Sequence, residues 1–461
     1  MKINRLPELQ RREFLRRSSA LGLAGVAAPW ALSLAGIGEA AAATAPGDYK
    51  ALVCVFLYGG NDYGNTLVPY DQPSYAAYAA IRQALATPQA QLAATALTTA
   101  QNLGGRQMAL APQLGKLKSL WDAGKLGVQL NVGTLIQPTT LRQYNDKSVP
   151  LPPKLFSHND QQSVWQSSSP EGATTGWGGR MGDLFLGANG TSTFTCINAS
   201  GNAVFMSGQQ AVQYQVSTSG AVPINAITKP LYGSQACADA LRGLITAAGR
   251  SHWMEAELNR VVTRSVAAQS TVGSALAALP PLATAFDTTS SLSNQLLMVA
   301  KLIAARQALG ATRQVFFVSI GGFDLHDFLV AQHPGLLTAV DSALASFHAA
   351  TVELGVDSQV TTFTASDFGR TLASNGDGAD HGWGSHHFVL GGAVKGGQYW
   401  GTLPSVSVNG PDDVGQGRLL PTTGVDQLAA TLATWMGVSA TDLPRVLPQI
   451  VNYGRRDMAY F

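Results

Sequence analysis

The sequence is poor in cysteine, in charged residues and in long apolar runs. Cys54, Cys196 and Cys237 are the three cysteines of 461 residues, too few for a disulfide framework, so a hydrophobic core must supply the stability. Cys54 lies in an apolar strand pattern and is expected to be a buried thiol, while a Cys196–Cys237 bridge stays open. Charged residues make up 13% of the chain, against about a quarter in average proteins, which fits a protein that works outside the cytoplasm.

The N-terminal region has the pattern of an export signal. Residues 11–16 read Arg-Arg-Glu-Phe-Leu-Arg, an apolar stretch covers 20–35, and small residues fill 40–43. This pattern predicts a twin-arginine signal peptide over residues 1–43 and a periplasmic or secreted protein. The alternative is retention as a membrane anchor, but the apolar stretch of 16 residues is short for a spanning helix. No later stretch approaches a membrane span.

The charge of the chain argues against a nucleic-acid partner. The net charge is +2, and residues 1–43 hold six basic and three acidic residues, which leaves about −1 for the rest. Basic runs are absent beyond the signal region. Nucleic-acid recognition needs a basic surface that this composition does not provide.

Buried strands that alternate with helices predict the fold class. Nearly continuous apolar runs are typical of strands covered on both faces, as in a parallel sheet. We therefore expect a doubly wound, mostly parallel α/β sheet with helices on both faces. The expected strands are 51–57, 127–131, 314–320 and 359–365, and the expected helices are 73–85, 112–124, 252–275, 288–309, 335–354 and 424–437.

Two segments differ from this alternation. Residues 190–230 alternate polar and apolar side chains between Gly and Ser residues, which predicts a small insertion of antiparallel strands. Residues 234–310 have a helical pattern. We expect a single domain over 44–461 that carries both segments.

Polar side chains gather where the predicted strands end. In a parallel sheet, functional groups collect at the carboxyl ends of the strands. Five of the eight histidines lie in such patches, and imidazole with carboxylate is a ligand set for a divalent metal ion, Zn²⁺, Mn²⁺, Mg²⁺ or Ca²⁺. The patches are 59–62, 156–160 with 176–180, 321–327, 366–371 and 377–387.

Each patch also has a purely structural interpretation. Asp62 could close a turn, Asp367 could pair locally with Arg370, and Ser157 could cap a helix. Neighbouring residues of a strand point to opposite faces, so at most one of His386 and His387 is expected to face a site.

The assembled motifs resemble the bacterial domain-of-unknown-function 1501 family, which itself resembles the alkaline phosphatase–sulfatase superfamily. The resemblance covers the chain beyond the signal and implies an alkaline phosphatase-like α/β fold with a dinuclear metal site. The motifs that carry it are Leu57 to Asp62, Ser157-His158 with Gly176 to Arg180, Gly321 to His326, Asp367 to Thr371, and Asp380-His381.

The resemblance also implies roles for single residues. Ser157 falls at the position of the nucleophile. Phe368 stands where the superfamily has a histidine next to the second aspartate, and His381 is the candidate to replace it. The implied metal ligands are Asp62, Asp324, His326, Asp367, His381 and His386, with His387 as the alternative to His386.

These roles predict an exported metal-dependent hydrolase of phosphate or sulfate esters. Two metal ions would hold the attacking and leaving oxygens, Ser157 would form a covalent intermediate, and Arg180 or Arg370 would bind the oxyanion. The alternative is a non-catalytic envelope protein that keeps the fold and acts as a binding or assembly partner. The expected partners are accordingly a small ester substrate or another exported protein.

Overall fold

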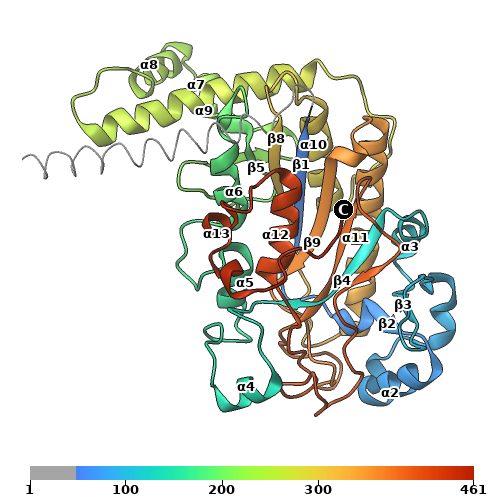
Figure 1. Cartoon of the computed structure of the whole chain (residues 1–461). Coiled ribbons are helices and arrows are strands. Elements are labelled where there is room, and N and C mark those ends of the chain that lie inside the picture. The colour runs from blue at the N-terminus through green and yellow to red at the C-terminus, as the bar shows by residue number, and fades with distance from the viewer. Residues whose placement is uncertain (1–47) are drawn as a thin grey trace, which may run out of the picture.

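A computed structural model describes residues 48–461, so the predicted signal peptide lies outside the described residues. A ten-stranded sheet forms the centre, in the order β11-β4-β10-β9-β1-β8-β5-β6-β7, with β12 beside β4 (Figure 1). β1 (Lys50–Leu57) pairs in parallel with β8 (Arg313–Ile320) on one side and with β9 (Val360–Ser366) on the other. All three are strands that the apolar runs predict.

Helices cover both faces of the sheet. Successive residues of β1 enter opposite cores: Val53 packs in the core with α10 (Ser291–Ala304) and α11 (Leu329–Glu353), and Cys54 in the core with α12 (Val425–Met436). The doubly wound α/β fold is therefore confirmed. The other helices of the main body are α2 (Gln72–Arg82), α3 (Gly115–Asp122), α4 (Leu141–Asp146), α5 (His158–Ser167), α6 (Trp177–Phe185) and α13 (Leu443–Val446).

One strand beyond β9 is antiparallel, and the loop that precedes this strand contributes to the site. β10 (Ser385–Gly391) runs antiparallel to β9 and to β4 (Leu126–Gly133), while β11 (Tyr399–Trp400) and β12 (Thr423–Gly424) run parallel to β4. Because β10 runs backwards, the loop before it lies at the edge where β9 ends. A separate two-stranded sheet consists of β2 (Leu67–Pro69) and β3 (Met108–Leu110).

The segment 190–230 joins the main sheet. β5 (Cys196–Asn198) pairs in parallel with β8, and β6 (Tyr214–Ser217) pairs in parallel with β5. The prediction of antiparallel strands holds only for β6 and β7 (Gly220–Ala221). Polar–apolar alternation identifies strands but carries no information on their direction, which here depends on the helix that precedes β5.

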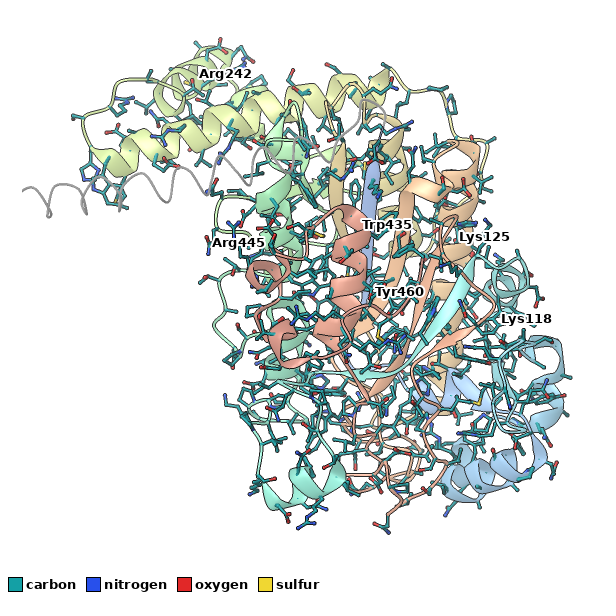
Figure 2. All side chains as sticks on the ribbon, viewed as in Figure 1. Lys118, Lys125, Arg242, Trp435, Arg445 and Tyr460 are labelled. Carbon is teal, nitrogen blue, oxygen red and sulfur yellow. The ribbon has the colours of Figure 1, made fainter. Side chains whose placement is uncertain are left out.

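The helices α7 (Asn225–Thr228), α8 (Gln235–Ile245) and α9 (Trp253–Ala277) form an arm that extends beyond the sheet (Figure 1). Figure 2 shows Arg242 on the outer part of this arm, whereas Tyr460 lies on the body beside the sheet. Only the second half of α9 contributes side chains to the core, through Ala268, Val272 and Ala275.

Two smaller findings complete the description. Cys54 and Cys196 are buried, Cys237 is exposed, and all three are free thiols. Among residues 48–461, no helix combines the length and the apolar character that a membrane span requires.

Candidate metal centre

The site lies at the edge where the three central strands end. Leu57, the last residue of β1, is opposite Ile320 of β8 and Ser366 of β9. The segments that follow these strands therefore start side by side, as the parallel pattern predicts. The loop before β10 and the first turn of α5 complete the site.

Two glycines after β1 allow these segments to approach closely. Gly59 and Gly60 have φ angles of +113° and +85°, which favour glycine. A Cβ atom on Gly59 would lie 2.3 Å from the backbone nitrogen of Asp324, and one on Gly60 would lie 2.4 Å from the ring of Phe368. The Gly59 N–H instead donates to Asp367 Oδ2 at 3.1 Å.

Three imidazoles and one carboxylate converge at this edge; we call His158, Asp324, His326 and His381 the His–Asp cluster. Nε2 of His381 lies 3.0 Å from Nε2 of His158 and 2.9 Å from Nε2 of His326. Asp324 Oδ1 lies 3.2 Å from Nε2 of His326 and 3.4 Å from Nε2 of both His158 and His381. Asp324 Oδ1 and His381 Nε2 are thus each close to the other three donor atoms.

The outer ring nitrogens define the tautomers of these histidines. Each Nδ1 faces an oxygen of a carboxylate or a carbonyl, and such oxygens accept hydrogen bonds. Each Nδ1 therefore carries a hydrogen, and each ring presents an Nε2 lone pair to the cluster when it is neutral. The three contacts are His158 Nδ1 to Asp367 Oδ2 at 2.6 Å, His326 Nδ1 to Asp380 Oδ1 at 3.3 Å, and His381 Nδ1 to Phe156 O at 2.7 Å.

The electrostatics of the cluster favour an ionised Asp324 and a neutral His381, whereas they favour the protonated form of His158. The hydrogen bond to Asp367 raises the pKa of His158, whereas burial lowers the pKa of His381. Burial raises the pKa of Asp324, but the hydrogen bond and positive charge of Arg370 outweigh it and the net shift is downward. Asp367 is fully buried, and its Oδ1 has no hydrogen-bond partner among the described residues.

The spacing fits one metal ion. Ligands arranged tetrahedrally at about 2.1 Å from a zinc ion lie about 3.4 Å from one another, and His158 Nε2, His381 Nε2 and Asp324 Oδ1 lie 3.0–3.4 Å apart. The ligand atoms of His158, Asp324 and His381 all lie within 4.8 Å of one another. The side chains of Asp324 and His158 are 48% and 25% exposed, so the cluster is open to solvent on one side.

Three of the residues predicted as metal ligands belong to the cluster, and one further histidine, His158, lies with them. Asp324, His326 and His381 come together as the motif order predicts. Asp367 is close by, but its Oδ2 contacts Nδ1 of His158, and so it orients that ring from behind. His158 belongs to one of the predicted patches but not to the predicted ligands, and its position as the first residue of α5 places it beside the strand ends.

Asp62 does not reach the cluster. It is buried, pairs with Arg82, and accepts a hydrogen bond from the Gly64 N–H at 3.2 Å. Asp62 therefore closes a turn, as the structural interpretation of the Gly-Gly-Asn-Asp sequence predicts. It also forms a buried ion pair.

His386 and His387 are also outside the cluster, because β10 begins only after the loop that carries His381. Nδ1 of His386 accepts from the Asn131 N–H at 3.0 Å, and its ring packs edgewise on Tyr63. Nδ1 of His387 lies 3.3 Å from Thr364 Oγ1. Burial lowers the pKa of both rings to about 3, so both are neutral residues of the core.

The three residues predicted to take part in catalysis have different surroundings. Ser157 precedes α5, and its hydroxyl donates to Asp160 Oδ2 at 3.0 Å. Arg180 donates to the backbone carbonyls of Val446, Thr175 and Ser167. Arg370 is fully buried and contacts the cluster through Asp324. The guanidinium groups of Arg180 and Arg370 are therefore held by the protein itself.

The sequence matches one family over nearly the whole described chain. The model of the family described as Protein of unknown function (DUF1501) matches residues 49–444. The sequence has no match among the curated proteins that were searched.

Several solved structures are similar over most of the chain, at low identity. A lipoteichoic acid synthase from Listeria monocytogenes is 8% identical, with 92% of this chain and 80% of that chain aligned and a TM-score of 0.32. A sulfatase from Pseudoalteromonas is 10% identical, with 90% and 74% aligned and a TM-score of 0.35. A protein from a study of glycosaminoglycan metabolism by Bacteroides thetaiotaomicron is also 10% identical, with 85% and 73% aligned and a TM-score of 0.34.

Proposed function

The chain belongs to this family, and we propose that it is an exported hydrolase of phosphate or sulfate esters that depends on one divalent metal ion bound by the His–Asp cluster. The observation that carries the proposal is that Nε2 of His381 lies 2.9–3.0 Å from the Nε2 atoms of both His326 and His158, with Asp324 Oδ1 beside all three. Lone pairs repel one another at this distance unless a proton or a metal cation lies between them, and a metal ion would satisfy both contacts of His381 at once. Three imidazoles and a carboxylate are a ligand set that suits zinc.

The charges of the site also support a divalent ion. Asp324 is in the cluster, Asp367 and Asp380 contact its histidines, and the guanidinium of Arg370 contacts Asp324. Three carboxylates and one guanidinium leave two negative charges, which one divalent ion neutralises. Carboxylates behind metal-binding histidines fix the orientation of the rings and make them better ligands.

The open side of the cluster is where an ester would bind. A bound ion would polarise the phosphoryl or sulfuryl group and stabilise negative charge on its oxygens. Ser157 remains the proposed nucleophile because of its place in the motif order and its position next to His158. Its hydrogen bond to Asp160 offers an acceptor for its proton, as activation of a serine requires.

Metal analysis paired with a substrate panel tests this proposal. The purified protein is expected to contain one equivalent of metal and to hydrolyse at least one of an aryl phosphate, an aryl phosphodiester and an aryl sulfate. Asp324→Ala combined with His326→Ala should remove both the metal and the activity. Asp62→Asn is the matched control, since Asp62 lies outside the cluster, and it should retain the metal. Unchanged metal content in the double variant would refute the metal site.

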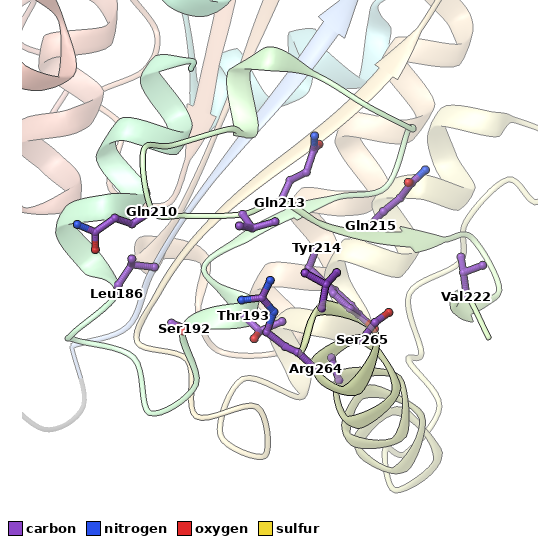
Figure 3. A pocket seen from close by; sticks show the side chains of 13 residues that line it. Leu186, Ser192, Thr193, Gln210, Gln213, Tyr214, Gln215, Val222, Arg264 and Ser265 are labelled. Atoms are coloured by element: carbon purple, nitrogen blue, oxygen red, sulfur yellow. The ribbon is translucent and has the colours of Figure 1, made fainter. Parts of the chain in front are cut away.

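A second candidate function is favoured by the arm. Trp253, Met254 and Leu258 of α9 are 74%, 59% and 57% exposed, which is unusual for large apolar side chains on one helix. A cavity of about 430 Å³ lies between α9 and β6, with Arg264, Tyr214 and other residues in its wall (Figure 3). These features suit a protein that binds another exported protein.

The two candidates make different predictions for the arm. Trp253→Ser combined with Leu258→Ser should leave the rate of ester hydrolysis unchanged if the protein is a hydrolase. If the protein is an assembly partner, the same variant should lose the exported protein that co-purifies with the wild type, and no ester of the panel should be cleaved.

A further inference from the structure

Arg370 contacts every segment that builds the His–Asp cluster except α5. Its Nε donates to Gly60 O at 3.0 Å and its Nη1 to Ala379 O at 3.0 Å. Its Nη2 donates to Phe323 O at 3.2 Å and to Asp324 Oδ1. One buried guanidinium thus connects the end of β1, the end of β8 and the loop that carries His381.

The contact with Asp324 fixes the carboxylate oxygen that faces the imidazoles. Oδ1 of Asp324 receives the hydrogen bond from Arg370 and is the same oxygen that lies 3.2–3.4 Å from the three Nε2 atoms. A carboxylate oxygen has two lone-pair directions. If Arg370 uses one of them, the other is directed at the centre of the cluster.

The same contact places a fixed positive charge beside the metal position. Arg370 Nη1 also lies 3.4 Å from Nε2 of His326. Two side chains that a second metal ion would require, Asp62 and His386, lie outside the cluster. The guanidinium therefore already places one positive charge against Asp324 and His326.

We propose that Arg370 is a positioning residue that orients Asp324 and supplies the second positive charge of the site, so that the protein binds one metal ion and not two. This inference rests on the proposed metal site. The planar fork of arginine holds several acceptors in fixed directions, which the ammonium of lysine does not do. We therefore expect metal binding to depend on the geometry of the Arg370 guanidinium as well as on its positive charge.

The substitution Arg370→Lys tests the proposal because it keeps the charge and removes the fork. The matched control is Arg180→Lys, which disrupts a guanidinium that also holds three backbone carbonyls but contacts no residue of the cluster. Zinc affinity is measured by titration of the metal-free proteins against a chelator, and the melting temperature of each metal-free protein is measured in parallel.

Wild type should bind one zinc ion per chain at saturation. Arg370→Lys should bind zinc 10–100-fold more weakly, the range for loss of a group that orients a metal ligand, whereas Arg180→Lys should match the wild type even if both variants melt at lower temperature. Equal zinc affinity of Arg370→Lys and wild type, or two ions per wild-type chain, would overturn the inference and leave the metal site intact. Wild type without zinc affinity would overturn the proposed function as well.

Discussion

Two neighbouring parallel strands of this protein end in almost the same sequence, and their aspartates have different surroundings. β1 is followed by Gly59-Gly60-Asn61-Asp62, and β8 by Gly321-Gly322-Phe323-Asp324. Asp62 is buried against Arg82, with both side chains at most 2% exposed. Asp324 is half exposed and faces three imidazoles as well as Arg370. A strand-end carboxylate is thus a structural or a metal-binding group according to what the rest of the fold places next to it.

The two aspartates differ in the arginine with which each one pairs. Arg82 comes from α2, outside the central sheet, and turns Asp62 away from the edge where the histidines meet. Arg370 comes from the segment after β9 and leaves one side of Asp324 open to the cluster. Four substitutions can break or sharpen this contrast.

Replacement of Asp324 should have the largest effect. Asp324→Ala removes the one carboxylate of the cluster, and we expect zinc affinity to fall by more than the 10–100-fold loss that follows removal of an orienting group, with ester hydrolysis abolished. Inductively coupled plasma mass spectrometry of the dialysed protein checks the metal. Retention of a full zinc equivalent would show that Asp324 is not a ligand.

Replacement of Asp62 should cost stability and spare the metal. Asp62→Ala leaves the charge of Arg82 buried without its partner, which typically destabilises a protein by about 3–5 kcal/mol. Urea unfolding of the metal-free protein measures this loss, and zinc titration should give the wild-type affinity. Weakened zinc binding with unchanged stability would reverse the assignment of the two aspartates.

The contrast between Asp62 and Asp324 also shows which features the sequence could predict and which it could not. The buried strands, the helices between them and the gathering of His and Asp at one edge follow from local patterns, since apolar runs and parallel strand ends are local or topological properties. The choice between Asp62 and Asp324 depends on Arg82 and Arg370, which are 20 and 46 residues away from their partners. No local pattern indicates such a pairing.

His158 and His386 show the same limit. His158 enters the cluster because α5 begins beside the strand ends, a tertiary placement that the Ser-His pair does not reveal. His386 is one residue into β10, and the direction of that strand carries it into the core. Counting histidines near a strand end therefore finds the site but not its members.

Replacement of Asp367 should give an intermediate effect on the metal. Asp367→Asn keeps an oxygen for the His158 Nδ1–H but removes the negative charge that makes the ring a stronger ligand. We expect zinc affinity to fall 10–100-fold, measured by competition with a chelator. An unchanged affinity would mean that the contact of 2.6 Å between these residues does not affect the metal.

Asp426 is a buried carboxylate that forms no ion pair with a guanidinium among the described residues. Its replacement should have the smallest effect of the four. Burial raises the pKa of Asp426 to about 6. Because the folded-state pKa lies above that of the unfolded chain, its stabilising contribution is complete below pH 4 and is lost as the pH rises to 6. The full loss, reached above pH 6, is roughly 3 kcal/mol.

Asp426→Asn should remove this dependence, so the unfolding free energy should fall less between pH 4 and pH 7 than in the wild type. Guanidinium unfolding at several pH values measures the difference. Parallel curves for the two proteins would show that folding does not raise the pKa of Asp426.

The metal content of the wild type and of the double variant His158→Ala, His381→Ala tests the central claim most directly. These two residues contribute two of the three Nε2 atoms of the cluster, and the ring of His381 makes its polar contacts with the Phe156 carbonyl and the cluster. We predict one divalent ion per wild-type chain and none in the variant. Wild-type protein that takes up no metal from a zinc-containing buffer, or a variant that retains it, would contradict the account.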